Sequence, residues 1–205
     1  MNLPIQNCTA HKNPATLRKK TEIHNVSLLF KFNIQSFDTM AHIKIKDAHV
    51  QTSGSLPRVG SVAPDFLLAD NKLNDVSLRL FHGRNVLMNI FPSIDTRVCA
   101  MSVREFNQRA ADIANTVVLC ISRDLPFAQK RFCAAEGIGN VITLSDFRDK
   151  GFSEAYGVEM LDGEMAGLHA RAVVVVDPEG VVRYTELVPV IGQEPDYDKA
   201  LQALK

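Results

Sequence analysis

Apolar and polar residues follow two kinds of pattern along the chain, and each kind predicts one type of secondary structure. Short apolar runs and strict apolar–polar alternation are typical of strands, whereas apolar residues spaced three or four apart are typical of helices. The first kind predicts strands at 42–46, 66–68, 76–78, 86–91, 117–121, 141–144, 172–177 and 181–188. The second kind predicts helices at 97–113 and 127–136, a helical turn at 153–156 and a C-terminal helix from Asp196.

Turn residues separate these segments where a strand or helix must end. Gly137 follows the helix at 127–136 and is typical of a helix C-terminus. Pro178, Glu179 and Gly180 lie between the last two strands and predict a hairpin turn. The order is therefore strand–helix–strand–helix–strand, then two strands and a final helix, which is typical of a thioredoxin-like α/β fold.

The first 39 residues differ from the rest of the chain. They have no clear periodicity, and basic residues cluster at Lys12 and at 18–20. A targeting segment is one interpretation, although the apolar patch at 26–30 is short for a secretory signal. We expect instead a poorly structured or non-native extension at 1–39, in the second case with Met40 as the natural start, and a folded domain at 40–205.

Composition narrows the classes of partner and compartment. The chain has 23 Lys and Arg against 23 Asp and Glu, so no excess charge favours nucleic acid or an acidic membrane surface. No apolar stretch approaches the ~20 residues that span a bilayer. The four cysteines form no CxxC and no paired metal-ligand spacing, and we expect a reducing compartment, the cytoplasm, and no structural metal.

The candidate chemistry lies between the strand at 86–91 and the helix at 97–113. Cys99 falls in or near the first turn of this helix, where the positive end of the helix dipole favours thiolate over thiol. A helix end supplies at most ~2 kcal/mol, less than the ~3.4 kcal/mol that lowers a thiol pKa from ~8.5 to ~6. We therefore expect a nearby cation to help.

Three residues in this segment carry a family resemblance. Pro92, Thr96 and Cys99 match the peroxidatic motif Pro-x-x-x-Thr-x-x-Cys, so the chain resembles the peroxiredoxins, and the string from Asn89 to Val103 is closest to their thiol peroxidase subgroup. The resemblance runs from about Ser53 to the C-terminus. It implies a thioredoxin-like peroxiredoxin fold, with a central mixed sheet flanked by helices and an N-terminal β-hairpin, and a homodimer.

The resemblance also assigns roles to particular residues. It makes Cys99 the peroxidatic cysteine, Arg171 the cation beside it and Cys133 the resolving cysteine that forms a Cys99–Cys133 disulfide. Thr96 would donate its hydroxyl to the sulfur or the peroxide, although a plain helix N-cap is the alternative. Pro92 would shape the turn and shield the sulfur, or simply end the strand. Without the resemblance, Cys133 would be a small buried helix residue.

Other residues near these positions have less specific interpretations. Cys120 lies in an unbroken apolar strand and is expected in the core. Asp95 could cap the helix or orient the arginine, and Arg97 could face the sulfur or solvent. We expect His169 to be a surface or turn residue rather than a base. Cys8 lies in the extension and is given no role.

The implied function is that of a thioredoxin-dependent peroxiredoxin, which reduces hydrogen peroxide and alkyl hydroperoxides. Sulfur carries both electrons, so the cycle needs no metal, flavin or haem cofactor. A thiol–disulfide oxidoreductase would use a CxxC, which the chain lacks. A peroxide-responsive redox sensor and a non-catalytic thioredoxin-fold module, acting as a binding protein or holdase, stay open as alternatives.

Overall fold

The computed structural model describes residues 40–110, 113–148 and 150–205. The extension expected at 1–39 lies outside the described residues. The helices are α1 (Arg97–Ala110), α2 (Pro126–Glu136), α3 (Gly151–Ala155) and α4 (Tyr197–Gln202). The strands are β1 (His42–Ile45), β2 (Ala48–Gln51), β3 (Leu67–Asp70), β4 (Asp75–Ser77), β5 (Asn85–Ile90), β6 (Thr116–Ser122), β7 (Ile142–Ser145), β8 (Ala172–Val176) and β9 (Val182–Leu187).

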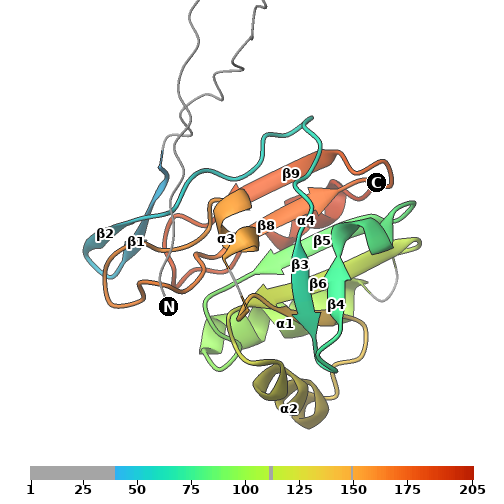
Figure 1. Cartoon of the computed structure of the whole chain (residues 1–205), viewed down its shortest axis with the longest axis horizontal. Coiled ribbons are helices and arrows are strands. Elements are labelled where there is room, and N and C mark those ends of the chain that lie inside the picture. The colour runs from blue at the N-terminus through green and yellow to red at the C-terminus, as the bar shows by residue number, and fades with distance from the viewer. Residues whose placement is uncertain (1–39, 111–112, 149) are drawn as a thin grey trace, which may run out of the picture. The chain divides into compact units, whose positions relative to one another are not determined.

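A seven-stranded mixed sheet forms the centre of the fold, in the order β4-β3-β7-β6-β5-β8-β9. Strands β5, β6 and β7 are parallel, and β8 runs antiparallel beside β5. The pair β1–β2 forms a separate antiparallel sheet, seen apart from the main sheet in Figure 1. The thioredoxin-like mixed sheet and the N-terminal hairpin are thus confirmed.

Most predicted elements are present, although the ends of several differ from the predicted ones by one or more residues. The strand expected at 76–78 stops at Ser77, because the backbone N–H of Leu78 donates to the Asp65 carboxylate and a short 3-10 helix begins there. In the described residues, the helix expected at 97–113 ends at Ala110. Gly137 ends α2 in a left-handed conformation, as its position predicts.

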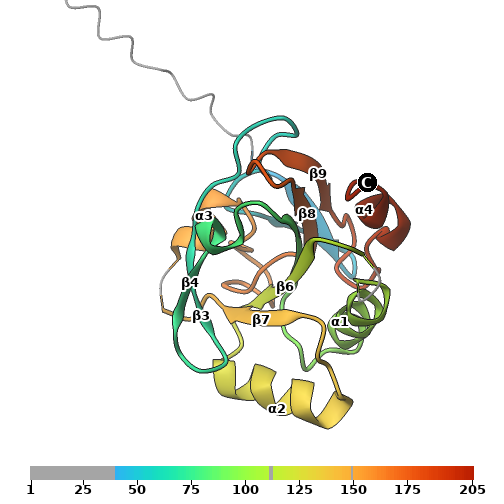
Figure 2. The same cartoon turned by 90° about the vertical axis from the view of Figure 1, so that its right-hand side faces the viewer.

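Alternation along β5 divides the core between the two faces of the sheet. Val86 and Met88 belong to a cluster with Phe152 of α3. Leu87 belongs to a second cluster with Val103 of α1 and residues of α4. Figure 2 shows α1 and α4 on one side of the sheet and α3 on the other. Both faces are covered, which explains why β5 reads as a continuous apolar run.

The topology gathers several loops at one edge of the sheet. The parallel strands β5, β6 and β7 all end at this edge, and the antiparallel strand β8 begins there. The register pairs Ile90 with Ala172, so the residues that follow β5 lie beside those that precede β8. Arg171 is therefore brought to the start of the loop that leads to Cys99.

Among the described helices, none is long and apolar enough to cross a membrane.

Candidate active site

The loop between β5 and α1 presents Cys99 at the edge of the sheet. Asp124, just past the end of β6, holds this loop by accepting hydrogen bonds from the Ser93 hydroxyl and the Ile94 backbone N–H, both at 2.7 Å. Thr96 directly precedes α1, and Cys99 is the third residue of the helix. The thiol therefore lies in the first helical turn, as the sequence predicts, and its side chain is fully buried.

Two polar side chains contact the sulfur of Cys99. Thr96 Oγ1 lies 2.8 Å from Sγ, and Arg171 Nη2 lies 3.4 Å from it. Because sulfur has a larger radius than oxygen, the contact with Arg171 is an ordinary hydrogen-bond length and the contact with Thr96 is a close one. A hydroxyl and a guanidinium both donate, so the geometry stabilises a thiolate at this position. The structure thus brings Cys99, Thr96 and Arg171 together.

The Thr96 hydroxyl has one proton and two possible acceptors. It lies 3.1 Å from the Ser93 carbonyl as well as 2.8 Å from the sulfur of Cys99. When the sulfur carries a proton, Thr96 donates to Ser93 and accepts from the thiol. When the sulfur is a thiolate, the Thr96 proton turns toward it. Thr96 can therefore follow a change in the charge of the sulfur by a rotation about one bond.

Arg171 is buried, and two of its three guanidinium nitrogens have hydrogen-bond partners among the described residues. Its Nε and Nη2 donate to the Ile191 carbonyl at 3.2 and 3.1 Å, which fixes the plane of the guanidinium. Its Nη1 is also buried and has no hydrogen-bond partner in the described part of the chain. A buried N–H without a partner is costly. This donor is available to a small oxygen-containing ligand.

A hollow of about 190 Å³ lies over these residues. Its lining is Pro92, Thr96, Arg97, Val98, Met165, Arg171, Ile191 and Gly192. The same Thr96 and Arg171 side chains thus contact both the sulfur and the hollow. Pro92 is buried on one wall of the hollow. A hydroperoxide placed here would meet Thr96 and Arg171, the two residues that contact the sulfur of Cys99.

Polar residues inside the core support the first turn of α1. Ser102 Oγ donates to the Cys99 carbonyl at 2.8 Å, and Asn89 Nδ2 donates to Ser102 Oγ at 3.1 Å. All three are fully buried. Sequence analysis did not identify Asn89, Ser102 or Asp124. One signal was present, because Asp124 is a charged residue at the carboxyl end of a buried parallel strand, where functional loops gather.

The two other described cysteines have different surroundings. Cys120 is fully buried in β6, and this burial raises its pKa to about 12, against a smaller opposing effect of Asn89. Its expected place in the core is confirmed. Cys133 is half-buried in α2, and burial raises the pKa of its thiol, although nearby Thr143 opposes the shift. Cys99 and Cys133 are both free thiols in this structure.

Three less specific expectations have mixed outcomes. His169 is wrong as a surface or turn residue, because it is fully buried and its Nε2 lies 2.9 Å from Asp146. Its partner lies 23 positions earlier, directly after the end of β7, and no local pattern indicates this pairing. Asp95 faces outward, 3.8 Å from Arg131, rather than toward Arg171. Arg97 is exposed on the rim of the hollow.

The fold and the buried cysteine with its two donors define the peroxiredoxin class of thioredoxin-like proteins. Residues 58–201 match the Redoxin family. Over 165 residues, the chain is 56% identical to the thiol peroxidase of Mycobacterium bovis, covering 80% of this chain and 99% of that one. The chain therefore belongs to the Redoxin family and, within it, to the thiol peroxidases.

Solved structures agree with this assignment. A peroxiredoxin-like protein from Aquifex aeolicus superposes with a TM-score of 0.74 at 36% identity, covering 80% of this chain and 96% of that one. A thiol peroxidase from Chromobacterium violaceum also superposes with a TM-score of 0.74, at 24% identity and over 80% and 95% of the two chains. The second likeness supports the fold.

Proposed function

We propose that the protein is a thiol peroxidase that reduces hydrogen peroxide and organic hydroperoxides to water and alcohols. The observation that carries this proposal is the contact of Cys99 Sγ with Thr96 and Arg171 beneath a hollow, with the buried Nη1 of Arg171 unpaired among the described residues. Preorganised donors around a nucleophile stabilise the charge that develops as a bond breaks.

The first step transfers one oxygen atom to sulfur. The Cys99 thiolate attacks the terminal oxygen of the hydroperoxide, the O–O bond breaks, and the alkoxide or hydroxide takes up a proton and leaves. Cys99 becomes a sulfenic acid, and the peroxide is reduced by two electrons. Arg171 and Thr96 stabilise the negative charge as it moves from sulfur to the leaving oxygen, and Pro92 excludes water from the sulfur.

The second step regenerates the enzyme through Cys133. The Cys133 thiol condenses with the sulfenic acid of Cys99, releases water and forms an intrachain disulfide. A dithiol, which we propose to be thioredoxin, then reduces this disulfide by exchange. The three described cysteines are free, which suits a cycle that starts from the reduced cytoplasm. The enzyme would then be a thioredoxin-dependent peroxiredoxin, and we expect it to act as a homodimer.

The disulfide step requires local motion. Cys99 is fully buried, and Cys133 lies on a different helix that follows another strand. Disulfide geometry is narrow, with Cα atoms ~5.5–6 Å apart. We expect the first turn of α1 and the Cys133 end of α2 to unwind once the sulfenic acid has formed. Local opening of this kind costs far less than global unfolding.

The first test is the intact mass of the reduced protein after one equivalent of hydroperoxide. We expect the wild type to lose two hydrogens, with the change mapped to a Cys99–Cys133 peptide. The Cys133→Ser variant should gain one oxygen on Cys99, and Cys120→Ser should behave as the wild type. An unchanged wild-type mass would reject the peroxidase and favour a non-catalytic binding or holdase module.

Turnover separates the enzyme from a redox sensor. With thioredoxin, its reductase and a reduced nicotinamide, an enzyme consumes many equivalents of peroxide per chain, whereas a sensor stops after about one. We expect sustained turnover that Cys99→Ser abolishes. Oxygen on Cys99 without a disulfide would assign a one-cysteine mechanism and leave Cys133 as a core residue.

A further inference from the structure

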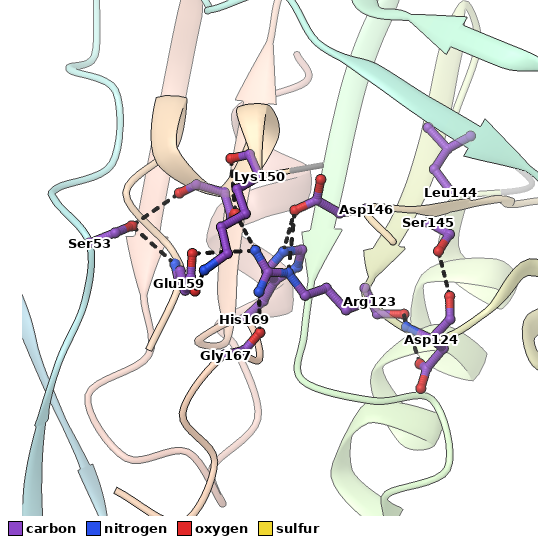
Figure 3. Close-up of polar contacts among 12 residues, drawn as sticks. Ser53, Arg123, Asp124, Leu144, Ser145, Asp146, Lys150, Glu159, Gly167 and His169 are labelled. Atoms are coloured by element: carbon purple, nitrogen blue, oxygen red, sulfur yellow. Dashed lines mark hydrogen bonds and ion pairs between the residues drawn. The ribbon is translucent and has the colours of Figure 1, made fainter. Parts of the chain in front are cut away.

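A buried ion cluster lies beside the active site at the same edge of the sheet. It consists of Arg123, Asp146, Glu159 and His169, whose side chains are 15%, 1%, 8% and 0% exposed. The exposed Lys150 closes it from outside through an ion pair with Glu159 at 2.6 Å. Figure 3 shows these side chains pointing toward one another. Buried charges are costly and add little net stability even when paired, so such a cluster needs a reason beyond stability.

The cluster contacts the segment that leads to Arg171. An Arg123 Nη1 hydrogen bond reaches the Gly167 carbonyl. His169 Nε2 lies 2.9 Å from Asp146, and Arg123 also approaches Asp146, at 3.6 Å. One residue further on, the Ala170 N–H donates to the Val158 carbonyl at 2.7 Å. The chain is therefore fixed at 167, 169 and 170, immediately before Arg171.

The same short turn also holds the loop that carries Cys99. Arg123 and Asp124 are consecutive residues after β6. Arg123 contacts the segment before Arg171, while Asp124 contacts Ser93 and the Ile94 N–H. The two halves of the site come from distant parts of the chain, and this turn binds both. It sets the placement of Arg171 relative to the sulfur.

We propose that Arg123, Asp146 and His169 are positioning residues that hold Arg171 over Cys99. This inference rests on the proposed peroxidase function. The polar contacts of the Cys99 sulfur come from Thr96 and Arg171, not from these three side chains. Among the described residues, the guanidinium of Arg171 has hydrogen bonds only to the Ile191 carbonyl and the sulfur of Cys99. Its distance from the sulfur therefore depends on the position of the Arg171 backbone. A displacement of about 1 Å at a reacting centre can cost ~10²-fold in rate.

The protonation of His169 follows from its two ring nitrogens. Nδ1 is buried and has no partner in the described part of the chain, so a proton there would be unsatisfied. A proton on Nε2 instead lets the ring donate to the Asp146 carboxylate. His169 therefore acts as a hydrogen-bond donor to Asp146. Glutamine can supply such a donor at this position, whereas alanine cannot.

Two variants at His169 and one control test the proposal. The rate of Cys99 oxidation by hydrogen peroxide is measured by rapid quench, thiol alkylation and mass, and the disulfide step is timed in the same samples. We expect His169→Ala to slow the oxidation by about tenfold and to leave the disulfide step unchanged. His169→Gln should recover most of the rate. The thiolate absorbance near 240 nm, referenced to Cys99→Ser, should fall in His169→Ala alone.

The control is Arg183→Ala at the other end of the sheet. Arg183 pairs with the buried carboxylate of Asp177 at 2.6 Å, just past the far end of β8, the strand that Arg171 precedes. Its loss should lower thermal stability and leave Cys99 oxidation unchanged. If His169→Ala is folded and reacts as fast as the wild type, the proposal is overturned.

A second variant covers the case in which His169→Ala does not fold. Arg123→Lys keeps a positive charge beside Asp146 and Glu159 but lacks the fork that also reaches the Gly167 carbonyl. We expect the same selective loss of oxidation rate, and a wild-type rate would overturn the proposal. Failure of the proposed peroxidase function would be distinguishable from these outcomes, because in that case the wild type itself would not react with peroxide.

Discussion

At the scale of single residues, the site depends on donors that the fold holds against one buried sulfur. Thr96 lies about one helical turn before Cys99 in the sequence. Arg171 directly precedes β8, and the antiparallel pairing of Ile90 with Ala172 brings it close to the sulfur. The Thr96 hydroxyl can serve either the sulfur or the Ser93 carbonyl. We therefore expect the Thr96 hydroxyl to affect mainly the rate of the reaction, in which negative charge moves onto the leaving oxygen of the peroxide, and to affect folding stability less.

Removing this hydroxyl should slow the reaction with peroxide. Thr96→Val keeps the branched shape and loses the donor, so we expect the rate of Cys99 oxidation to fall by about 10²-fold, as for the loss of one preorganised donor. Thr96→Ser keeps the hydroxyl and should retain most of the rate. The measurement is the pseudo-first-order loss of free Cys99 over a range of peroxide concentrations. A Thr96→Val rate within a factor of two of the wild type would assign Thr96 to helix capping alone.

The residues of the site differ in how far the sequence could reveal them. Pro92, Thr96 and Cys99 share one local motif, and the family resemblance assigned Arg171 the place beside the sulfur. The roles of Asp124, Asp146 and His169 depend on pairing with residues 23 to 31 positions away, which lie in loops beyond the ends of other strands. No spacing along the chain encodes that pairing. His169 was consequently taken for a surface residue.

At the scale of elements, apolar runs predicted the buried strands well, because β5, β6 and β8 are covered on both faces. Strand order was less accessible from the sequence, since β3 pairs with β7, which follows it only after three other strands and two α-helices. The ends of elements were set by single contacts, such as the Asp65 carboxylate that accepts from Leu78. Such contacts come from residues that are distant in sequence or chemically ordinary.

Helix α2 should open more readily as the pH rises. Burial raises the pKa of the Cys133 thiol in the closed helix, whereas an opened helix exposes a thiol of ordinary pKa, ~8.5. The Cys133 thiol therefore keeps its proton in the closed helix to a higher pH than in the opened helix. The free-energy advantage that this gives the closed helix is complete below pH ~8.5 and is lost progressively above it. We expect amide protection at the Cys133 end of α2 to fall severalfold between about pH 7.5 and 9.5, by hydrogen exchange with reductant present.

The matched control for this experiment is Cys133→Ser, which has no titrating thiol. Comparing the two proteins at each pH removes the intrinsic pH dependence of exchange. Amides in β5, which is remote from Cys133 along the chain, should show the same ratio at every pH. Equal protection in both proteins across the range would mean that the Cys133 thiol is not coupled to opening.

At the scale of the whole molecule, the fold also raises the pKa values of several buried or half-buried tyrosine and cysteine side chains that are neutral at pH 7. Tyr156 is fully buried, donates its hydroxyl to the Pro64 carbonyl at 2.8 Å, and has its pKa raised by burial and by the charge of Asp65. Burial also raises the pKa of Cys120 to about 12. Burial raises the pKa values of Tyr184 and Tyr197 as well, helped by Glu186 and Glu194 respectively. All of these groups keep their protons in the fold at pH values where the unfolded chain loses them.

The free energy of unfolding should therefore be flat near neutrality and decline at alkaline pH. The stability that these groups supply is fully present below the unfolded pKa values, ~8.5 for cysteine and ~10 for tyrosine, and is lost progressively above them. Urea unfolding with reductant at pH 7, 9, 10 and 11 measures this decline. Tyr156→Phe should cost about 1 kcal/mol at pH 7, since it removes one buried hydrogen bond. It should also make the decline above pH 10 shallower, because one titrating group is gone. Parallel curves for Tyr156→Phe and the wild type would show that alkaline unfolding is controlled by other groups.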